Sequence, residues 1–180
     1  PARPPPPRRP PSRRPRQPRP RPPPHPPRAQ SPLTLTNREA NAGDGPHLHP
    51  LVSELGDHHD ELHRMVSQPE DLEAGLVSAS DRQGCLLAEL EGEPVGFVYW
   101  YEVFTTFSAK PKLYMEDICV SKRARGTGTG FALVKALARI CVERGCSRFE
   151  WLAMSDNEAG QKFYTQIGGK VRQGAETWQL

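Results

Sequence analysis

The stretch Arg125-Gly126-Thr127-Gly128-Thr129-Gly130 decides the fold of this chain. It follows an apolar run at 113–120 and opens a segment, 131–144, whose apolar residues recur at the spacing of one helical face. The sequence therefore predicts a strand, a glycine turn and a helix in succession. Glycines at alternate positions let the backbone turn its N–H groups inward, and the helix adds the positive end of its dipole. Such a turn is suited to holding phosphate.

The spacing of the turn excludes two common phosphate loops. A Walker A loop needs Lys and then Ser or Thr after its last glycine, whereas Gly130 is followed by Phe131 and Ala132. The dinucleotide fingerprint needs two residues between its second and third glycines, and here only Thr129 separates them. A plain glycine-rich turn between strand and helix stays open as the alternative.

The turn and its flanks resemble one known superfamily. Arg125, Gly128 and Gly130 match R-x-x-G-x-G, which resembles the acetyl-coenzyme A loop of the GNAT acetyltransferases. The strand 114–117, Tyr-Met-Glu-Asp, and the later Asn157 with Phe163-Tyr164 resemble the diamine and thialysine branch, which includes spermidine/spermine-like enzymes. The resemblance runs from about Leu33 to Leu180. It implies an α/β GNAT fold, with a mixed central sheet splayed at the acetyl-CoA site and flanked by helices.

Hydrophobic periodicity and turn residues predict the order of elements. The expected strands are 33–38, 85–90, 95–103, 113–120, 148–153 and 176–180, and the expected helical segments are 45–76, 131–144 and 157–167.

The composition divides the chain into two parts. Residues 1–28 contain fifteen Pro and nine Arg with no acidic residue, which predicts disorder. We therefore expect a Pro/Arg-rich tail at 1–32 and the GNAT domain at 33–180. Removing the nine positive charges from the net +3 leaves −6 for the rest, which suits a cationic acceptor or simply solubility. For the tail, organellar import, SH3-like partners, nucleic acid and a nonessential extension all stay open.

Other features bound the cellular setting. No run approaches 18 apolar residues, so we expect no membrane contact, and the domain itself is not expected to bind nucleic acid. Cys85, Cys119, Cys141 and Cys146 form no C-x-x-C pair, which favours buried thiols in a reducing, cytoplasmic setting. The segment 59–63, His-Asp-Glu-Leu-His, lacks the glutamate directly after its first histidine that a zincin helix needs, so no metal site is expected.

Acetyl transfer to an amine needs a proton acceptor, a polarised carbonyl and a proton donor. The resemblance implies that Glu116 receives the proton of the amine, directly or through water, and that Tyr164 protonates the departing thiolate. Since side chains alternate along a strand, Glu116 and Asp117 are predicted to point to opposite faces. The alternatives are a solvated or salt-bridged acidic pair and, for Tyr164, an aromatic core residue beside Phe163.

The resemblance also implies an acetyl-CoA site, in which a backbone N–H between Ile118 and Val120 polarises the thioester carbonyl. For Asn157, the alternative to a contact with acetyl-CoA is that it only caps the N-terminus of a helix. The expected acetyl-CoA residues are Ile118, Cys119, Val120, Arg125, Gly126, Thr127, Gly128, Thr129, Gly130, Phe131 and Asn157.

The acceptor side departs from the polyamine enzymes. His58-His59 stands where they carry Tyr-Glu, and Thr106 stands where they carry an acidic residue, although Glu176 matches a glutamate that remains. We therefore expect a small amine with its own carboxylate, such as thialysine, or a short diamine. A protein lysine or N-terminal acetyltransferase and a non-catalytic acyl-CoA-binding domain are the alternatives. Dimers are common in the GNAT family that the chain resembles, so the resemblance leaves a homodimer open.

Overall fold

A mixed five-stranded sheet forms the centre of the domain. The computed structural model describes residues 1–3, 33–77 and 80–174. The strands are β1 (Leu35–Glu39), β2 (Gln83–Leu90), β3 (Glu93–Thr105), β4 (Lys110–Val120) and β5 (Phe149–Trp151), in this order across the sheet. The first four are antiparallel, and β5 runs parallel to β4. The predicted last strand, 176–180, and the tail from residue 4 to 32 lie outside the described residues.

The helical segments predicted within 45–76 are observed as three separate pieces. The helices are α1 (Gly45–His58), η1 (Leu62–Arg64), α2 (Pro69–Leu76), η2 (Lys122–Ala124), α3 (Thr129–Glu143) and α4 (Glu158–Gln166). Asp60 has a φ of 56° directly after α1, and α2 starts anew at Pro69 behind a capping box of Gln68 and Asp71. The predicted end of α3 at a glycine is confirmed, since Gly145 has a φ of 64°.

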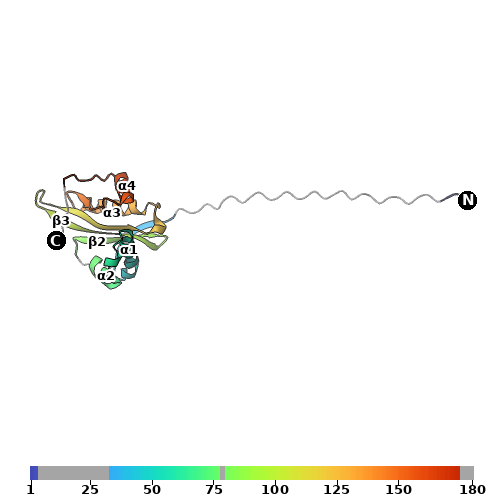
Figure 1. Ribbon diagram of the computed structural model, residues 1–180, viewed down its shortest axis with the longest axis horizontal. Coiled ribbons are helices and arrows are strands. Elements are labelled where there is room, and N and C mark those ends of the chain that lie inside the picture. Colours follow the sequence, from blue (N-terminus) through green and yellow to red (C-terminus); the bar gives the residue numbers. More distant parts are fainter. Residues whose placement is uncertain (4–32, 78–79, 175–180) are drawn as a thin grey trace. The chain divides into compact units, whose positions relative to one another are not determined.

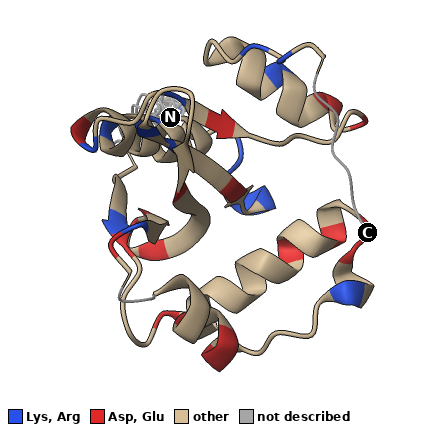
Figure 2. Cartoon of the chain, turned by 90° about the vertical axis from the view of Figure 1, so that its left-hand side faces the viewer, with Lys and Arg blue, Asp and Glu red and all other residues tan. Residues whose placement is uncertain are grey.

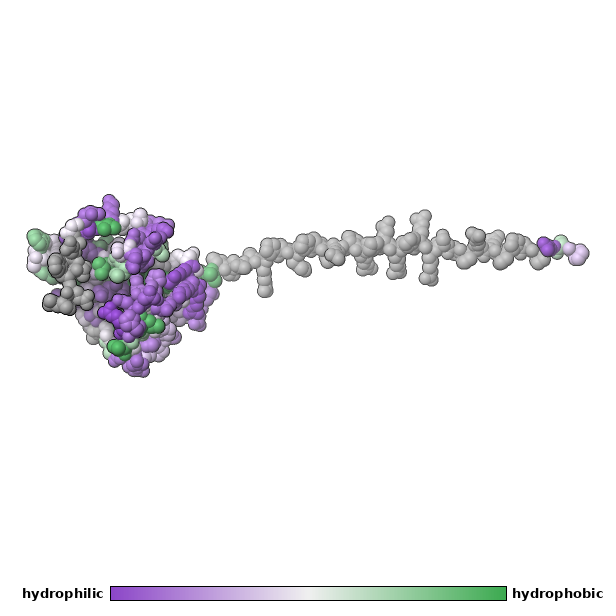
Figure 3. Space-filling view, in the orientation of Figure 1, coloured by the Kyte–Doolittle hydropathy of each residue, from purple (hydrophilic) through white to green (hydrophobic). Residues whose placement is uncertain are grey.

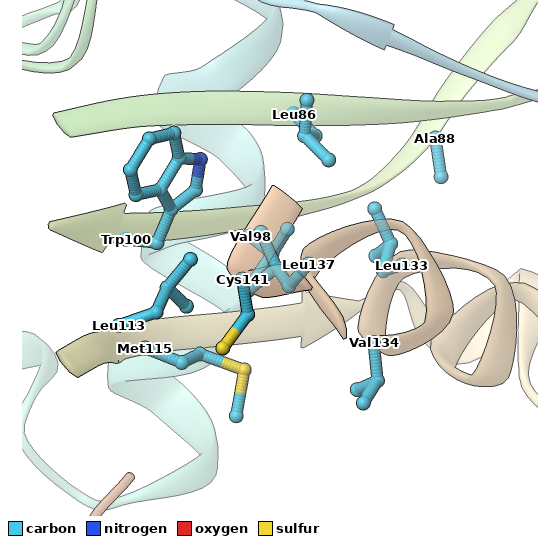
Figure 4. Close-up of a cluster of buried hydrophobic side chains, with 10 residues drawn as sticks. All are labelled: Leu86, Ala88, Val98, Trp100, Leu113, Met115, Leu133, Val134, Leu137 and Cys141. Carbon is cyan, nitrogen blue, oxygen red and sulfur yellow. The ribbon is translucent and has the colours of Figure 1, made fainter. Parts of the chain in front are cut away.

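The helices cover both faces of the sheet. Figure 1 shows α3 and α4 on one face and α1 and α2 on the other. Beneath α3, apolar side chains of the helix pack with those of β2, β3 and β4, and Figure 4 shows Leu133 and Leu137 in one cluster with Val98. On the opposite face, Leu48 and Leu51 of α1 belong to a second buried cluster. Burial of these two clusters stabilises the three layers by removing apolar surface from water.

The sheet splits between β4 and β5. The two strands pair only at Leu113 with Phe149, Tyr114 with Glu150 and Met115 with Trp151, whereas β4 continues to Val120. Beyond Met115, no described strand pairs with the β4 edge that faces β5. The predicted splayed sheet is therefore observed, and an open backbone edge lies directly ahead of the glycine turn.

The described surface of the domain is mixed in charge and mostly polar. In Figure 2, acidic and basic residues are interspersed over the ribbon. On the face seen in Figure 3, most coloured residues are hydrophilic and the hydrophobic ones lie in small groups. Among the helices of the described segments, none is long and apolar enough to cross a membrane.

Gly96 allows β3 and β4 to approach closely beneath α3. A Cβ at this position would lie 2.8 Å from the carbonyl oxygen of Cys119 and 3.4 Å from the Thr129 Cγ2. We expect Gly96→Ala to lower the free energy of unfolding by about 1 to 3 kcal/mol, because backbone has to move. Denaturant unfolding measures this. The control is Gly75→Ala, where the new Cβ meets nothing within 4 Å and the helix gains propensity, so equal losses in the two variants would contradict the packing argument.

Candidate active site

A cleft of about 610 Å³ lies where the sheet is split. Its lining comes from the open part of β4, the glycine turn, the start of α3, the segment after β5, α4, and the end of α1. The residues predicted for acetyl-CoA that line it are Ile118, Cys119, Val120, Arg125, Gly126, Gly128, Thr129, Gly130, Phe131 and Asn157. The lining as a whole therefore brings together residues from Leu55 to Ile167, which are more than 100 positions apart in the sequence.

The glycine turn has the backbone that its sequence predicts. Gly126 and Gly128 have φ angles of 78° and 90°, a region that side chains with a Cβ rarely occupy. Gly128 is the N-cap of α3, so the first amides of this 15-residue helix lie at the cleft. Arg125 is exposed, and its Nε donates to the carbonyl oxygen of Val120 over 3.3 Å, which joins the turn to the end of β4.

Thr127 is exposed in the turn and is not in the cleft lining. Its Oγ1 donates to the carbonyl oxygen of Ala124 over 2.7 Å and lies 2.7 Å from the Oγ1 of Thr129, which is buried. The two hydroxyls thus join the turn to the start of α3. The prediction for Thr127 concerned its backbone amide, and it stays a prediction.

A β-bulge overturns the expected alternation at Glu116 and Asp117. Between β3 and β4, Tyr99 pairs with Asp117 and Trp100 with Met115, so Glu116 is the extra residue. Bulges shift the following side chains to the other face. Glu116 and Asp117 therefore both lie on the α1 face, and the prediction of opposite faces is wrong.

The two carboxyl groups have different surroundings on this face. Glu116 is exposed, and its Oε2 accepts a hydrogen bond of 2.8 Å from the hydroxyl of Tyr101. Asp117 is partly buried. Burial raises the pKa of Asp117, the charge of Glu116 raises it further, and His59 offsets part of this rise. Neither carboxylate is among the ion pairs found in the described residues, so the salt-bridge alternative is not supported there.

Helix α4 contributes one wall of the cleft. The side chain of its N-cap, Asn157, accepts a hydrogen bond of 2.8 Å from the backbone N–H of Gly160 while also lining the cleft. Tyr164 lines the cleft too, and its ring centroid lies 5.2 Å from that of Trp151. Burial raises the pKa of Tyr164, so the phenol is protonated at neutral pH. Tyr164 is thus both an aromatic packing residue and a group at the cleft.

The predicted acceptor residues are only partly brought together. His58 lines the cleft with His59, at a distance of 5.0 Å between ring centroids. Thr106 is exposed in the turn between β3 and β4 and is not in the lining, and Glu176 lies outside the described residues.

Sequence reasoning missed an apolar part of the lining. It comes mainly from the segment after β5 and from the cleft-facing side of α4, and includes Leu152, Ala153, Met154, Ala159 and Ile167. For α4, the three- and four-residue spacing after Asn157 was an available signal. After β5, the predicted strand continued to Ala153 whereas β5 ends at Trp151, and no periodicity marks the segment that follows.

The chain matches a known family over the residues that line the cleft. The sequence model described as the acetyltransferase (GNAT) family matches residues 50–168, more than half of the chain. The chain belongs to this family. The predicted fold and the predicted enzyme class, an N-acetyltransferase, are thereby confirmed for this GNAT domain.

Curated relatives of this GNAT domain are amine acetyltransferases by name. A thialysine N-epsilon-acetyltransferase of Sus scrofa is 28% identical over 149 residues, which cover 78% of this chain and 87% of that protein. A spermidine/spermine N(1)-acetyltransferase-like protein 1 of Homo sapiens is 29% identical, over 79% of this chain and 21% of that protein. Among solved structures, an aminoglycoside N-acetyltransferase in complex with CoA has a TM-score of 0.66 at 19% identity, covering 82% of this chain and 95% of that one. This last likeness shows the fold alone.

Proposed function

We propose that this GNAT domain transfers an acetyl group from acetyl-CoA to the primary amine of a small acceptor, thialysine-like or a short diamine. The observation that carries the proposal is the common lining of one cleft by the glycine turn, Glu116 and Tyr164. The names of the relatives support an amine as the acceptor.

The residues at the turn fit acetyl-CoA. The left-handed backbone at Gly126 and Gly128 and the start of α3 offer amides to a pyrophosphate. The apolar wall that contains Leu152 and Met154 suits an uncharged pantetheine arm. Acetyl-CoA would supply an activated thioester to be attacked, and a backbone N–H of β4 between Ile118 and Val120 would polarise its carbonyl.

Glu116 would accept the proton of the amine. An alkyl ammonium has a pKa near 10.4, so its deprotonation at neutral pH costs about 4 to 5 kcal/mol. A carboxylate attracts an ammonium group, and the bulge places the carboxyls of both Glu116 and Asp117 on the same face, where they can bind one. Glu116 is exposed enough to reach a solvent-borne acceptor, directly or through one water.

Tyr164 would donate the proton that the leaving thiolate needs. Burial raises the pKa of its phenol, so the proton stays in place until a strong acceptor forms nearby. A thiol has a pKa of about 8.5, so transfer from a phenol is uphill by at least about 2 kcal/mol. Regeneration of the phenol from solvent completes the proton balance.

The acceptor end of the cleft favours a small amine over a long polyamine. The imidazoles of His58 and His59 lie in the lining with the two carboxylates. A second ammonium group on the acceptor gains little binding energy from an imidazole. A carboxylate on the acceptor, by contrast, can accept a hydrogen bond from the imidazole N–H. An acceptor with an amine and a carboxylate therefore suits this mixture of groups.

The first prediction concerns the turn. Gly128→Val should abolish acetyl-CoA binding, because a β-branched residue cannot readily keep a φ of 90°. Isothermal calorimetry measures the affinity, and circular dichroism checks the fold. Gly92→Val is the matched control, because Gly92 has a φ of 83° and equally open surroundings in the β2–β3 turn, away from the cleft. Unchanged affinity in Gly128→Val would refute the binding assignment.

A second prediction separates binding from chemistry. Tyr164→Phe keeps the ring that packs against Trp151 and removes only the hydroxyl. We expect unchanged acetyl-CoA affinity and a loss of kcat of roughly 10² to 10⁴, the range of general acid catalysis. Stopped-flow detection of free thiol measures the rate. A variant with near-normal turnover would leave Tyr164 with its packing role alone.

The acceptor prediction also tests the function as a whole. We expect a higher kcat/KM for thialysine and short diamino compounds than for spermidine or spermine, since each missing charge-assisted contact is worth about 1.5 to 3 kcal/mol, or one to two decades. A panel of amines with acetyl-CoA, assayed by thiol release, gives these values. A preference for spermidine would show that other residues form a polyamine site. Acetyl-CoA binding with no release for any amine, peptide or protein would refute the catalytic proposal.

A further inference from the structure

The bulge leaves Glu116 without a cross-strand partner. A residue outside the regular register of a sheet is not oriented by neighbours on both sides. The Glu116 side chain is also exposed and has three rotatable bonds, so its position at the cleft would be poorly defined without a further contact. A proton acceptor has to lie within hydrogen-bond reach of its substrate, which makes this freedom costly for the reaction.

Tyr101 supplies the missing contact. Its hydroxyl donates to the Oε2 of Glu116 over 2.8 Å, although Tyr101 itself is not in the cleft lining. Its ring lies between two other tyrosines, with centroid distances of 6.1 Å to Tyr99 and 5.3 Å to Tyr114. The ring contacts fix the position of the hydroxyl, and the hydroxyl in turn fixes one oxygen of the carboxylate. In the described part of the chain, no hydrogen bond is found at the Oε1 of Glu116, so this oxygen is free for an acceptor.

We propose that Tyr101 is the positioning residue of the reaction: it holds the carboxylate of Glu116 toward the acceptor amine. The inference rests on the proposed function, in which Glu116 receives the proton.

The electrostatics of the neighbouring groups support this role. A donor to a carboxylate favours its ionised form, and a like charge beside it disfavours ionisation of the second group. The pKa of Asp117 is raised first by burial and then by the charge of Glu116, which shows that the two carboxyls lie close together. The titratable groups close enough for Glu116 to act on their pKa are Tyr99 and Tyr101 of β3 and Tyr114 and Asp117 of β4, and His58 and His59 at the end of α1 line the same cleft.

The test compares two tyrosines of the same row. Tyr101→Phe keeps the ring but removes the donor, whereas Tyr114→Phe removes a hydroxyl with no hydrogen bond to Glu116. With acetyl-CoA and the best amine of the panel, we expect Tyr101→Phe to lower kcat by about 3- to 30-fold, as for loss of a partly exposed hydrogen bond to a charged group. The KM for acetyl-CoA should be unchanged. The acid limb of the kcat/KM profile should move to higher pH, because the charged carboxylate has lost its donor. Tyr114→Phe should stay within about twofold of the unmodified chain, with the same profile.

A double-mutant cycle distinguishes the two proposals. If Tyr101 acts through Glu116, adding Tyr101→Phe to Glu116→Gln should cause no further loss of kcat and no further change in the pH profile. Additive losses, or a Tyr101→Phe profile equal to that of Tyr114→Phe, would overturn the role of Tyr101 and leave the proposed function intact. Full turnover in Glu116→Gln would instead overturn the assignment of Glu116, and the role of Tyr101 with it. Thermal unfolding of each variant checks that a loss of rate does not come from a loss of folded protein.

Discussion

The separation of β5 from β4 after Met115 is the constraint on which the rest of the site depends. Parallel pairing lasts for only three residues, and the chain then leaves the sheet. An aromatic group occupies the gap: Trp151 packs against Tyr164, and Phe163 lies against Gly130, where a Cβ would be 3.3 Å from the ring. Helix α4 therefore contacts the end of β5 through Tyr164 and the start of α3 through Phe163. If the strands stayed paired, their ladder would use the edge of β4, and no backbone donor would be left for a ligand.

The same contacts explain why residues with several functions meet at one place. The ring of Tyr164 packs against Trp151, and the same residue lines the cleft. Asn157 caps α4 and lines the cleft at the same time. Gly130 lets the ring of Phe163 approach the first turn of α3, directly after the glycines of the turn. Packing and site geometry are thus not separable at this edge, and a substitution that closes the gap would act on both.

Local sequence was sufficient for the parts of the fold that local chemistry determines. The strand 113–120, the turn at 125–130, and the helix that ends at Gly145 each follow from periodicity and glycine chemistry, and they occur within a few residues of the predicted bounds. Separate helical segments within 45–76 were predicted, but the place of the break was missed because Asp60 in a left-handed conformation leaves no strong signal in the sequence. The bulge at Glu116 was missed for a different reason: it is a property of the register between β3 and β4, and strict alternation along one strand cannot show it. Motif spacing found the residues of the turn and of α4, whereas Tyr101 could be found only once β3 and β4 were paired. The roles of Glu116 and Tyr164 in the chemistry stay predictions.

The bulge also bears on which acceptor the cleft can hold. Regular alternation would have put one carboxyl among the apolar side chains beneath α3, where burial of a charge is costly. The extra residue instead gathers Glu116 and Asp117 on the α1 face, toward the end of the helix that carries His58 and His59. His59 is therefore close enough to Asp117 to lower the pKa of its carboxyl. A molecule with an amine at one end and a carboxylate at the other can pair with both kinds of group, whereas a polyamine can pair with only one. Our proposal of an amino-acid-like acceptor rests on this arrangement of groups.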